Sequence, residues 1–103
     1  MSFDSTIHQP NRLRIMSALC ALPEGIGASF SDLRDVLSVT DGNIGAHLQK
    51  LRDAGYVEVT KRFVDEKPRT LVTAAAAGRR AFLGHVLALQ EIIRNPPELA
   101  GPA

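Results

Sequence analysis

The sequence of 103 residues contains one cysteine, no tryptophan and one tyrosine, and its net charge at pH 7 is only +1. A single cysteine excludes a disulfide within the chain and a zinc site built from cysteines alone. No apolar run is long enough to span a membrane, and the N-terminal segment lacks the pattern of a secretory signal. We therefore expect a cytoplasmic protein without a membrane partner. The near-neutral charge gives little support for nucleic acid by itself.

The composition is that of a folded globular protein, with 45% hydrophobic and 22% charged residues. A chain of this length has room for one domain with a single core. It contains no nucleophile beside a base and no glycine-rich phosphate loop after a strand, so neither an enzyme nor a cofactor is predicted. Cys20 lies in an apolar stretch, and His8 and His85 are expected on distant elements, which argues against a metal site.

Helices are predicted where apolar residues recur at helical spacing. The predicted bounds are 10–22, 31–38, 40–54 and 76–94. Pro10 suits the first turn of a helix, because it lacks an N–H that would remain unpaired there. Ser31 and Thr40 are predicted N-caps, and the Thr40 hydroxyl is expected to accept from the N–H of Asn43. Gly55 is expected to end the third helix.

Between the third and the fourth predicted helix, the spacing of the apolar residues changes to every second position. Residues 56–63 alternate and predict a strand, the polar segment 64–69 contains Pro68 and predicts a loop, and 70–75 predict a returning strand. A short apolar segment at 28–30 precedes the second helix. The predicted fold is therefore mainly α with a small β-hairpin (α+β), in the order helix, strand, helix, helix, hairpin, helix.

Two helices joined by a short turn and followed directly by a hairpin form a winged helix-turn-helix, whose second helix and hairpin wing grip duplex DNA. The segments IHQPNRLRIMSAL, LSVTDGNIGAHLQKLRDAGYVEVTKRFVDEKPRT and AAAAGRRAF carry a resemblance to the MarR/ArsR-like bacterial transcriptional regulators, especially their small single-domain members. The resemblance implies a domain at 1–94 with a recognition helix at 40–54, a wing at 56–75, a dimerisation helix at 76–94 and a loose tail at 95–103.

One arc of the third helix is expected to face DNA, because steps of about 100° per residue separate it from the apolar face of Ile44, Leu48 and Leu51. The predicted DNA-binding residues of this helix are Thr40, Asp41, Asn43, Gly45, Ala46, His47 and Lys50. Asn43 suits an adenine, and Lys50 suits a phosphate or a guanine. His47 has a second interpretation, a hydrogen bond to a backbone carbonyl of the preceding helix.

Two residues of this helix are ambiguous. Asp41 either stabilises the positive end of the helix dipole or accepts from a cytosine amino group. The regulators that the chain resembles usually carry a polar residue where this sequence has Gly45. That glycine either allows a close approach of the backbone to a phosphate or reflects drift.

The hairpin contributes a second set of predicted DNA contacts. These residues are Lys61, Arg62, Lys67 and Arg69. Long basic side chains that bracket a hairpin reach phosphates or enter a narrow minor groove. The alternative is an ordinary solvated hairpin of mixed charge, because Asp65 and Glu66 lie between the basic residues.

The last predicted helix is apolar over about 220° of its circumference, more than a surface helix needs to cover one core. The predicted dimer interface consists of Phe82, Leu83, Val86, Leu89 and Ile93. The alternative is that the first helix of the same chain buries this face. The resemblance also implies dimers, since such regulators usually dimerise through their terminal helices.

The sequence is thus interpreted as a sequence-specific regulator that binds double-stranded DNA as a homodimer and represses transcription. A winged-helix module that binds another protein instead of DNA is the first alternative, and a small enzyme is the second. A thiolate metal switch is disfavoured by the single cysteine. An unknown small-molecule ligand at the dimer interface is compatible with the sequence.

Overall fold

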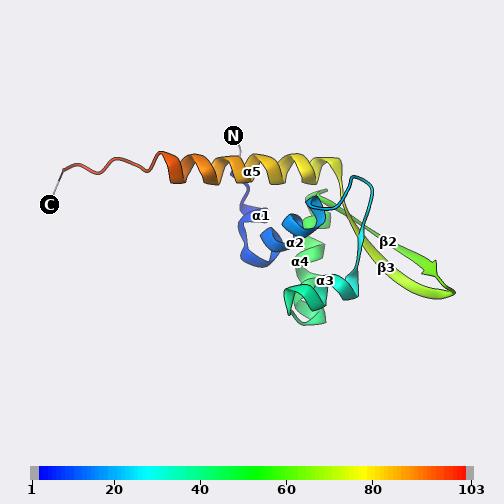
Figure 1. The fold of residues 1–103 in the computed structure, drawn as a ribbon. Coiled ribbons are helices and arrows are strands. Elements are labelled where there is room, and N and C mark those ends of the chain that lie inside the picture. The colour runs from blue at the N-terminus through cyan, green and yellow to red at the C-terminus, as the bar shows by residue number, and fades with distance from the viewer. Residues whose placement is uncertain (1–2, 102–103) are drawn as a thin grey trace.

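The computed structural model describes residues 3–101, apart from the Asp41 side chain, and Figure 1 shows the path of the chain. Within that range the elements are α1 (Ser5–His8), α2 (Pro10–Cys20), β1 (Ala28–Ser29), α3 (Phe30–Leu37), α4 (Asp41–Asp53), β2 (Val57–Val64), β3 (Lys67–Ala74) and α5 (Ala76–Arg94). The predicted fold class, mainly α with a small antiparallel sheet, is confirmed. The predicted bounds of the last helix agree with α5.

The short helix α1 has no counterpart among the predicted helices. The Asp4 carboxylate caps it by accepting from the N–H of Ile7 at 2.9 Å, and Ile7 is fully buried. A single turn is too short to show an apolar period, which explains why the pattern missed it. Gln9 then caps α2, which ends at Cys20 and not at Leu22 as predicted.

The helix α3 begins earlier than predicted. Ser29, and not Ser31, is its N-cap, because the Ser29 hydroxyl accepts from the N–H of Asp32 at 3.0 Å. Ser29 is also the last residue of β1, and its extended backbone is the conformation that an N-cap requires. At the other end Ser38 adopts a left-handed φ of 53° and terminates α3 before the turn to α4.

The hairpin of β2 and β3 is tighter than predicted. The two strands pair along their whole length, so the predicted loop at 64–69 is wrong and the turn consists of Asp65 and Glu66 alone. Both turn residues have positive φ, 52° and 64°, which matches the twist of a two-residue hairpin turn. Pro68 is tolerated inside β3 because β1 joins that strand farther from the turn.

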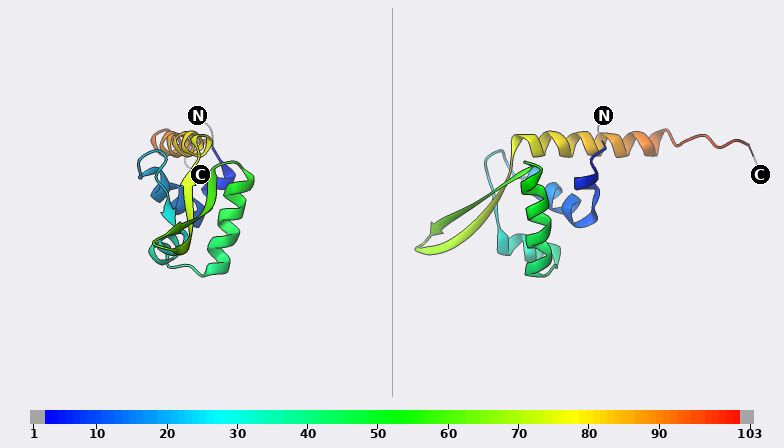
Figure 2. Two further views of the ribbon diagram at one scale, coloured as in Figure 1. Left: turned by 90° about the vertical axis from the view of Figure 1, so that its right-hand side faces the viewer. Right: turned by 180° about the vertical axis from the view of Figure 1, so that it is seen from behind.

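The core lies between the helices and the inner half of the sheet, whose strand order is β1-β3-β2. Its buried hydrophobic residues are Ile7, Ile15, Met16, Leu19, Leu33, Leu37, Ile44, Leu48, Leu51, Val57, Val72 and Ala74. Figures 1 and 2 show α5 lying across one side of this body, while the hairpin and the C-terminal tail extend in opposite directions. Within residues 3–101, no helix has both the length and the apolar character needed to cross a membrane.

Candidate nucleic-acid interface

The helix α4 presents a core face and a polar face, as its sequence predicts. Ile44 and Leu51 are fully buried and Leu48 nearly so, which anchors the helix on the body. The predicted contact residues Asn43, Ala46 and Lys50 are exposed, whereas Gly45 and His47 are half-buried. Thr40 is the N-cap, because its hydroxyl accepts from the N–H of Asn43 at 3.3 Å. Asp41 opens the helix, but its side chain lies outside the described part of the structure.

Gly45 faces a cleft between α4 and the inner half of the hairpin. The cleft has a volume of about 290 Å³ and is lined by Phe30, Gly45, Leu48, Gln49, Arg52, Val59 and Thr70. A Cβ atom added at Gly45 would meet no neighbouring atom within 4 Å. Packing within the chain therefore does not require glycine here, and both predicted interpretations of Gly45 stay open.

His47 contacts α2 through a side chain that the sequence did not indicate. Its Nδ1 atom lies 3.2 Å from Nη1 of Arg12, and the Arg12 Nε donates to the carbonyl of Thr6 at 2.6 Å. The partner of His47 is therefore a guanidinium and not a backbone carbonyl. Because a guanidinium only donates, Nδ1 accepts and the Nε2–H remains as a donor. Burial, followed by the positive charge of Arg12, lowers the pKa of His47 and favours this neutral form.

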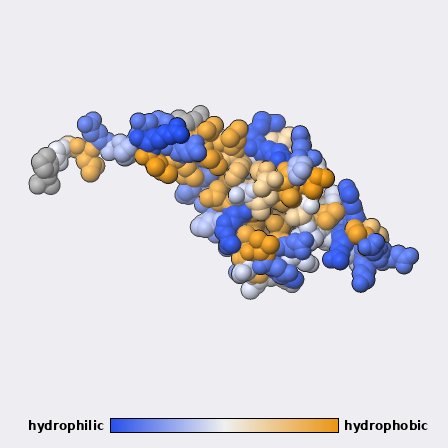
Figure 3. All heavy atoms as spheres, viewed as in Figure 1, coloured by the Kyte–Doolittle hydropathy of each residue, from blue (hydrophilic) through white to orange (hydrophobic). Residues whose placement is uncertain are grey.

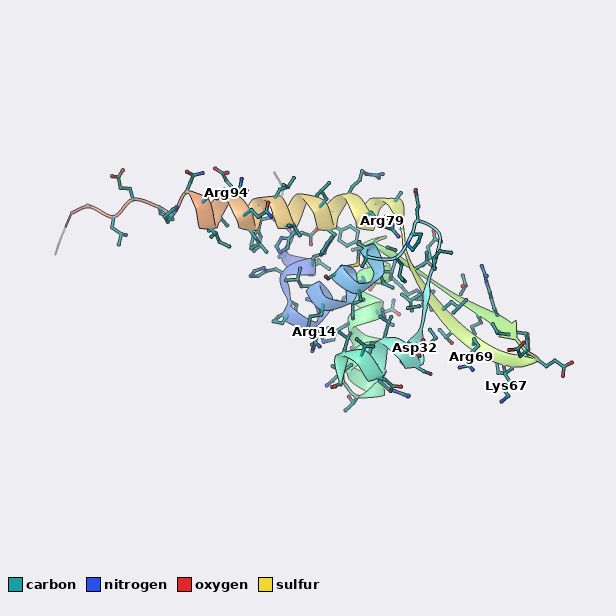
Figure 4. All side chains as sticks on the ribbon, in the orientation of Figure 1. Arg14, Asp32, Lys67, Arg69, Arg79 and Arg94 are labelled. Carbon is teal, nitrogen blue, oxygen red and sulfur yellow. The ribbon has the colours of Figure 1, made fainter. Side chains whose placement is uncertain are left out.

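The strand register divides the predicted cations of the hairpin between its two faces. Arg62 lies opposite Arg69, and Lys67 lies two pairs nearer the turn, so these three share a face. Lys61 belongs to the other face. All four are exposed, and Figure 4 shows Lys67 and Arg69 on the outer half of the hairpin. Like charges directly opposite each other weaken a hairpin, and a bound phosphate would offset that cost.

Two predicted sets of DNA contacts thus occupy adjacent elements. The hairpin leaves the body directly after α4, and α4 contacts β2. In the left view of Figure 2 the polar helix and the hairpin lie beside each other. A helix for one groove and a cationic hairpin for the adjacent backbone is the arrangement with which winged helices hold duplex DNA.

The predicted dimer interface lies on α5, whose burial is uneven. Phe82 is half-buried against the core of its own chain, and Val86 and Leu89 are also half-buried. Leu83 is 59% exposed and Ile93 is 78% exposed. Two residues outside the predicted set, Leu87 and Ile92, are exposed as well, and Figure 3 shows the apolar surface along this helix. The alternative that α2 buries the whole apolar arc is therefore wrong.

The N-terminal segment contacts α5 and the residues between α4 and β2 in a way that the sequence did not predict. Nδ1 of His8 lies 3.1 Å from Nε2 of His85, so these two histidines are not distant as expected. The Asp4 N–H donates to Nδ1 of His85 at 2.9 Å, and the Tyr56 hydroxyl donates to the Asp4 carboxylate. Burial, the first of its causes, lowers the pKa of His85, and the bond to Asp4 raises that of Tyr56. Within residues 3–101 no three potential metal ligands gather.

Comparison with known proteins identifies the class to which this fold belongs. Residues 11–93 match the family model described as the winged helix DNA-binding domain, and the chain is a member of that family. The family is one of DNA-binding proteins and not of enzymes. The chain is also 30% identical over 84 residues to an uncharacterized protein of Methanocaldococcus jannaschii. The aligned region covers 82% of this chain and 88% of that protein.

Solved structures show the same fold. A transcriptional regulator homologue from Pyrococcus horikoshii OT3 has a TM-score of 0.79 at 30% identity, covering 86% of this chain and 85% of that one. MepR of S. aureus in complex with DNA has a TM-score of 0.70 at 15% identity, covering 88% and 75%. A MarR protein from Peptoclostridium difficile has a TM-score of 0.61 at 20% identity, covering 85% and 52%. The resemblance to MarR-like regulators is thereby confirmed in the fold.

Proposed function

We propose that this protein regulates transcription in the cytoplasm as a homodimer that binds double-stranded DNA sequence-specifically and represses the genes beside its site. The observation that carries the proposal is the exposed polar face of α4 next to the exposed cations of the hairpin. In this arrangement α4 enters the major groove, and the hairpin contacts the backbone or the minor groove. The existence of MepR as a DNA complex with the same fold supports the arrangement.

The individual contacts follow from the chemistry of the exposed side chains. Asn43 reads a base, adenine being the one that its amide pairs with in two hydrogen bonds. Lys50 meets a phosphate or a guanine, and Thr40 meets a phosphate at the helix N-terminus. His47 offers its Nε2–H, since Arg12 occupies its other ring nitrogen. Asp41, Gly45 and Ala46 complete the proposed surface at the start and middle of α4.

The proposed dimer forms through α5. Leu83, Leu87 and Ile93 expose an apolar surface along this helix, and a second copy of the chain would bury it. We include Phe82, Val86 and Leu89 at the inner border of that interface, where each is already half-buried. Residues 1–94 then act as one unit, and 95–103 form a tail, of which 102–103 lie outside the described residues.

Two-fold symmetry of the dimer makes the operator palindromic, with half-sites about one helical turn apart. A dimer that occupies such a site in a promoter excludes other proteins from it, which is the basis for proposing repression. The interface between the two copies also offers a place for a small-molecule effector that would alter their relative orientation.

Binding to duplex DNA of mixed sequence at increasing salt concentration tests the central claim. We expect affinity at low salt and a steep decline as salt rises, because each phosphate contact releases condensed counterions. Selection of bound sequences from random DNA should then recover a palindrome. Absence of binding at low salt would refute the proposal.

A protein-binding module with the same fold is the second candidate. The observation that favours it is the net charge of +1, which gives the chain little general attraction to nucleic acid. The same titration separates the two candidates, since a protein-binding module would show no salt-dependent affinity for DNA.

A further inference from the structure

The outer half of the hairpin exposes an aromatic side chain to solvent. Phe63 is 79% exposed, and its partner across the hairpin is Pro68, which is also exposed. Figures 1 and 2 show that this part of the hairpin extends beyond the helical body. The pair therefore forms an apolar patch at a distance from the core, and its burial by a partner would be favourable.

The patch lies on the face of the hairpin that looks toward α4. Val59 and Thr70 line the cleft against α4, and they share a face with Lys61, Phe63 and Pro68 because side chains alternate along each strand. The side chain of Phe63 thus lies on the same side of the hairpin as the proposed recognition helix. DNA bound along α4 would approach this face of the wing.

Charge determines which part of the wing approaches DNA. Asp65 and Glu66 form the turn, so phosphates repel the extreme end of the hairpin. The two faces of the hairpin behind the turn carry positive charge instead. Lys61 lies on the same face as the apolar patch, and Arg62 and Arg69 lie on the opposite face. Such a wing contacts nucleic acid with the faces of its strands and not with its turn. The surrounding cations also disfavour a protein partner, because charged residues are depleted at the centres of protein interfaces.

We infer that Phe63, supported by Pro68, is an apolar contact of the wing in the minor groove of DNA, a role that rests on the proposed DNA binding. Proteins that use the minor groove frequently press phenylalanine or proline against base steps and partly unstack them. The ring would then select for deformable pyrimidine–purine steps beside the half-site, without reading hydrogen-bond donors or acceptors. It determines specificity next to the sequence contacted by α4.

Measurements on Phe63→Ala and on a matched control test this role. Val64→Ala is the control, because Val64 is the next residue of β2, is 44% exposed and lies on the opposite face. The probe is a duplex recovered by the parent protein from random DNA. We expect Phe63→Ala to weaken binding by about ten- to a hundredfold, as loss of an aromatic contact to bases does. The slope of affinity against salt should stay that of the parent, because no phosphate contact is removed.

A base analogue locates the contact in the groove. Inosine in place of guanine beside the half-site removes the amino group from the minor groove and leaves the major-groove acceptors N7 and O6 in place. The parent protein should bind the inosine duplex more tightly, since the step deforms more easily and the groove is less obstructed. Phe63→Ala should lose this preference, whereas Val64→Ala should retain it.

The possible results distinguish this inference from the proposed function. If the parent protein binds no DNA at low salt, both fail. If the parent binds with a steep salt dependence and Phe63→Ala binds equally well, the role of Phe63 fails and DNA binding stands. A weaker salt slope in Phe63→Ala, or an equal loss in Val64→Ala, would also overturn it, because the change would then act through the shape of the hairpin.

Discussion

The Nδ1 atom of His8 lies 3.1 Å from the Nε2 atom of His85, although 77 positions separate the two residues in the chain. His85 is fully buried on α5, and its other ring nitrogen accepts from the backbone N–H of Asp4. Nε2 of His85 must therefore carry the proton and donate to His8. A second proton on His85 has no place in this arrangement, so the contact requires the neutral form.

We expect the protein to lose stability in mild acid. The pKa of His85 is lowered by burial and then by His8, while the Asp4 carboxylate acts in the opposite direction. Because the unfolded histidine has the higher pKa, the unfolded chain binds protons first as the pH falls below about 6.5, and the free energy of unfolding decreases. Its slope is at most about 1.4 kcal/mol per pH unit for each such histidine. Urea unfolding at several pH values on either side of about 6.5 measures this slope.

His85→Gln removes this titration, so its free energy of unfolding should be lower near neutral pH and should vary less in mild acid. His47→Gln is the matched control, because the pKa of His47 is also lowered and its contact is with Arg12. It should retain the slope that His85 contributes. Equal pH profiles for the parent and His85→Gln would contradict the prediction.

Two helical glycines should respond to alanine with opposite signs. At Gly78 a Cβ atom would stand 2.0 Å from the carbonyl oxygen of Tyr56, so Gly78→Ala should cost about 1–3 kcal/mol of stability through overpacking. At Gly45 a Cβ would meet nothing within 4 Å, and Gly45→Ala should gain up to about 1 kcal/mol from helix propensity. Urea unfolding of both variants checks the pair. Equal effects of the two substitutions on stability would show that the close contact between residue 78 and the Tyr56 carbonyl does not destabilise Gly78→Ala.

Replacement of exposed residues on α4 should change DNA binding without changing stability. Asn43→Ala should cost about 1–3 kcal/mol of binding free energy at one operator position and relax discrimination there. Lys50→Ala should lower affinity for all sequences if it meets a phosphate. Binding to operator variants with single base changes measures both effects.

The control for α4 is Ile44→Ala, which opens a cavity in the core and should cost about 2–5 kcal/mol of stability. Operator binding by Asn43→Ala and Lys50→Ala that equals the binding of the parent would exclude α4 as the reading helix.

Simultaneous removal of Lys67 and Arg69 should weaken binding to all DNA sequences by a similar factor. If both side chains meet phosphates, the slope of log affinity against log salt should become shallower by roughly two per subunit. Titrations at several salt concentrations give the slope. A changed sequence preference would instead place one of these cations in a groove, and an unchanged affinity would leave the wing without a role in binding.

The dimer should dissociate when a charge enters the apolar surface of α5. Ile93 is 78% exposed in a single chain, so Ile93→Glu should leave the monomer folded and place two carboxylates in the interface. We expect the dimer dissociation constant to rise by at least about a hundredfold. Val36→Glu is the control, because Val36 is an apolar residue that is 70% exposed but belongs to α3 and not to α5. Sedimentation of the parent as a monomer at micromolar concentration would refute the dimer.

Local signals predicted most of the fold. Thr40 was predicted as an N-cap and is one, and Gly55 ends the third helix region with a φ of 78°, because both roles depend on a few neighbouring residues. The errors arose where two local signals compete. Ser29 and Ser31 are both capable N-caps, and the end of β1 at Ser29 decided between them. The segment 64–69 contains loop-forming residues, yet strand pairing continued to a two-residue turn.

The sequence by itself determined the order of the four longer helices and the hairpin, the core face of α4 and the exposed positions of Asn43 and Lys50. These features follow from periodicity and capping, which act between residues close in the chain. Tertiary structure alone decided that Arg12 meets His47 and that His8 meets His85. Those contacts join residues that are far apart in sequence and carry no shared pattern, so they exist only after the apolar faces of α1, α2, α4 and α5 have packed together and fixed the relative positions of their polar groups.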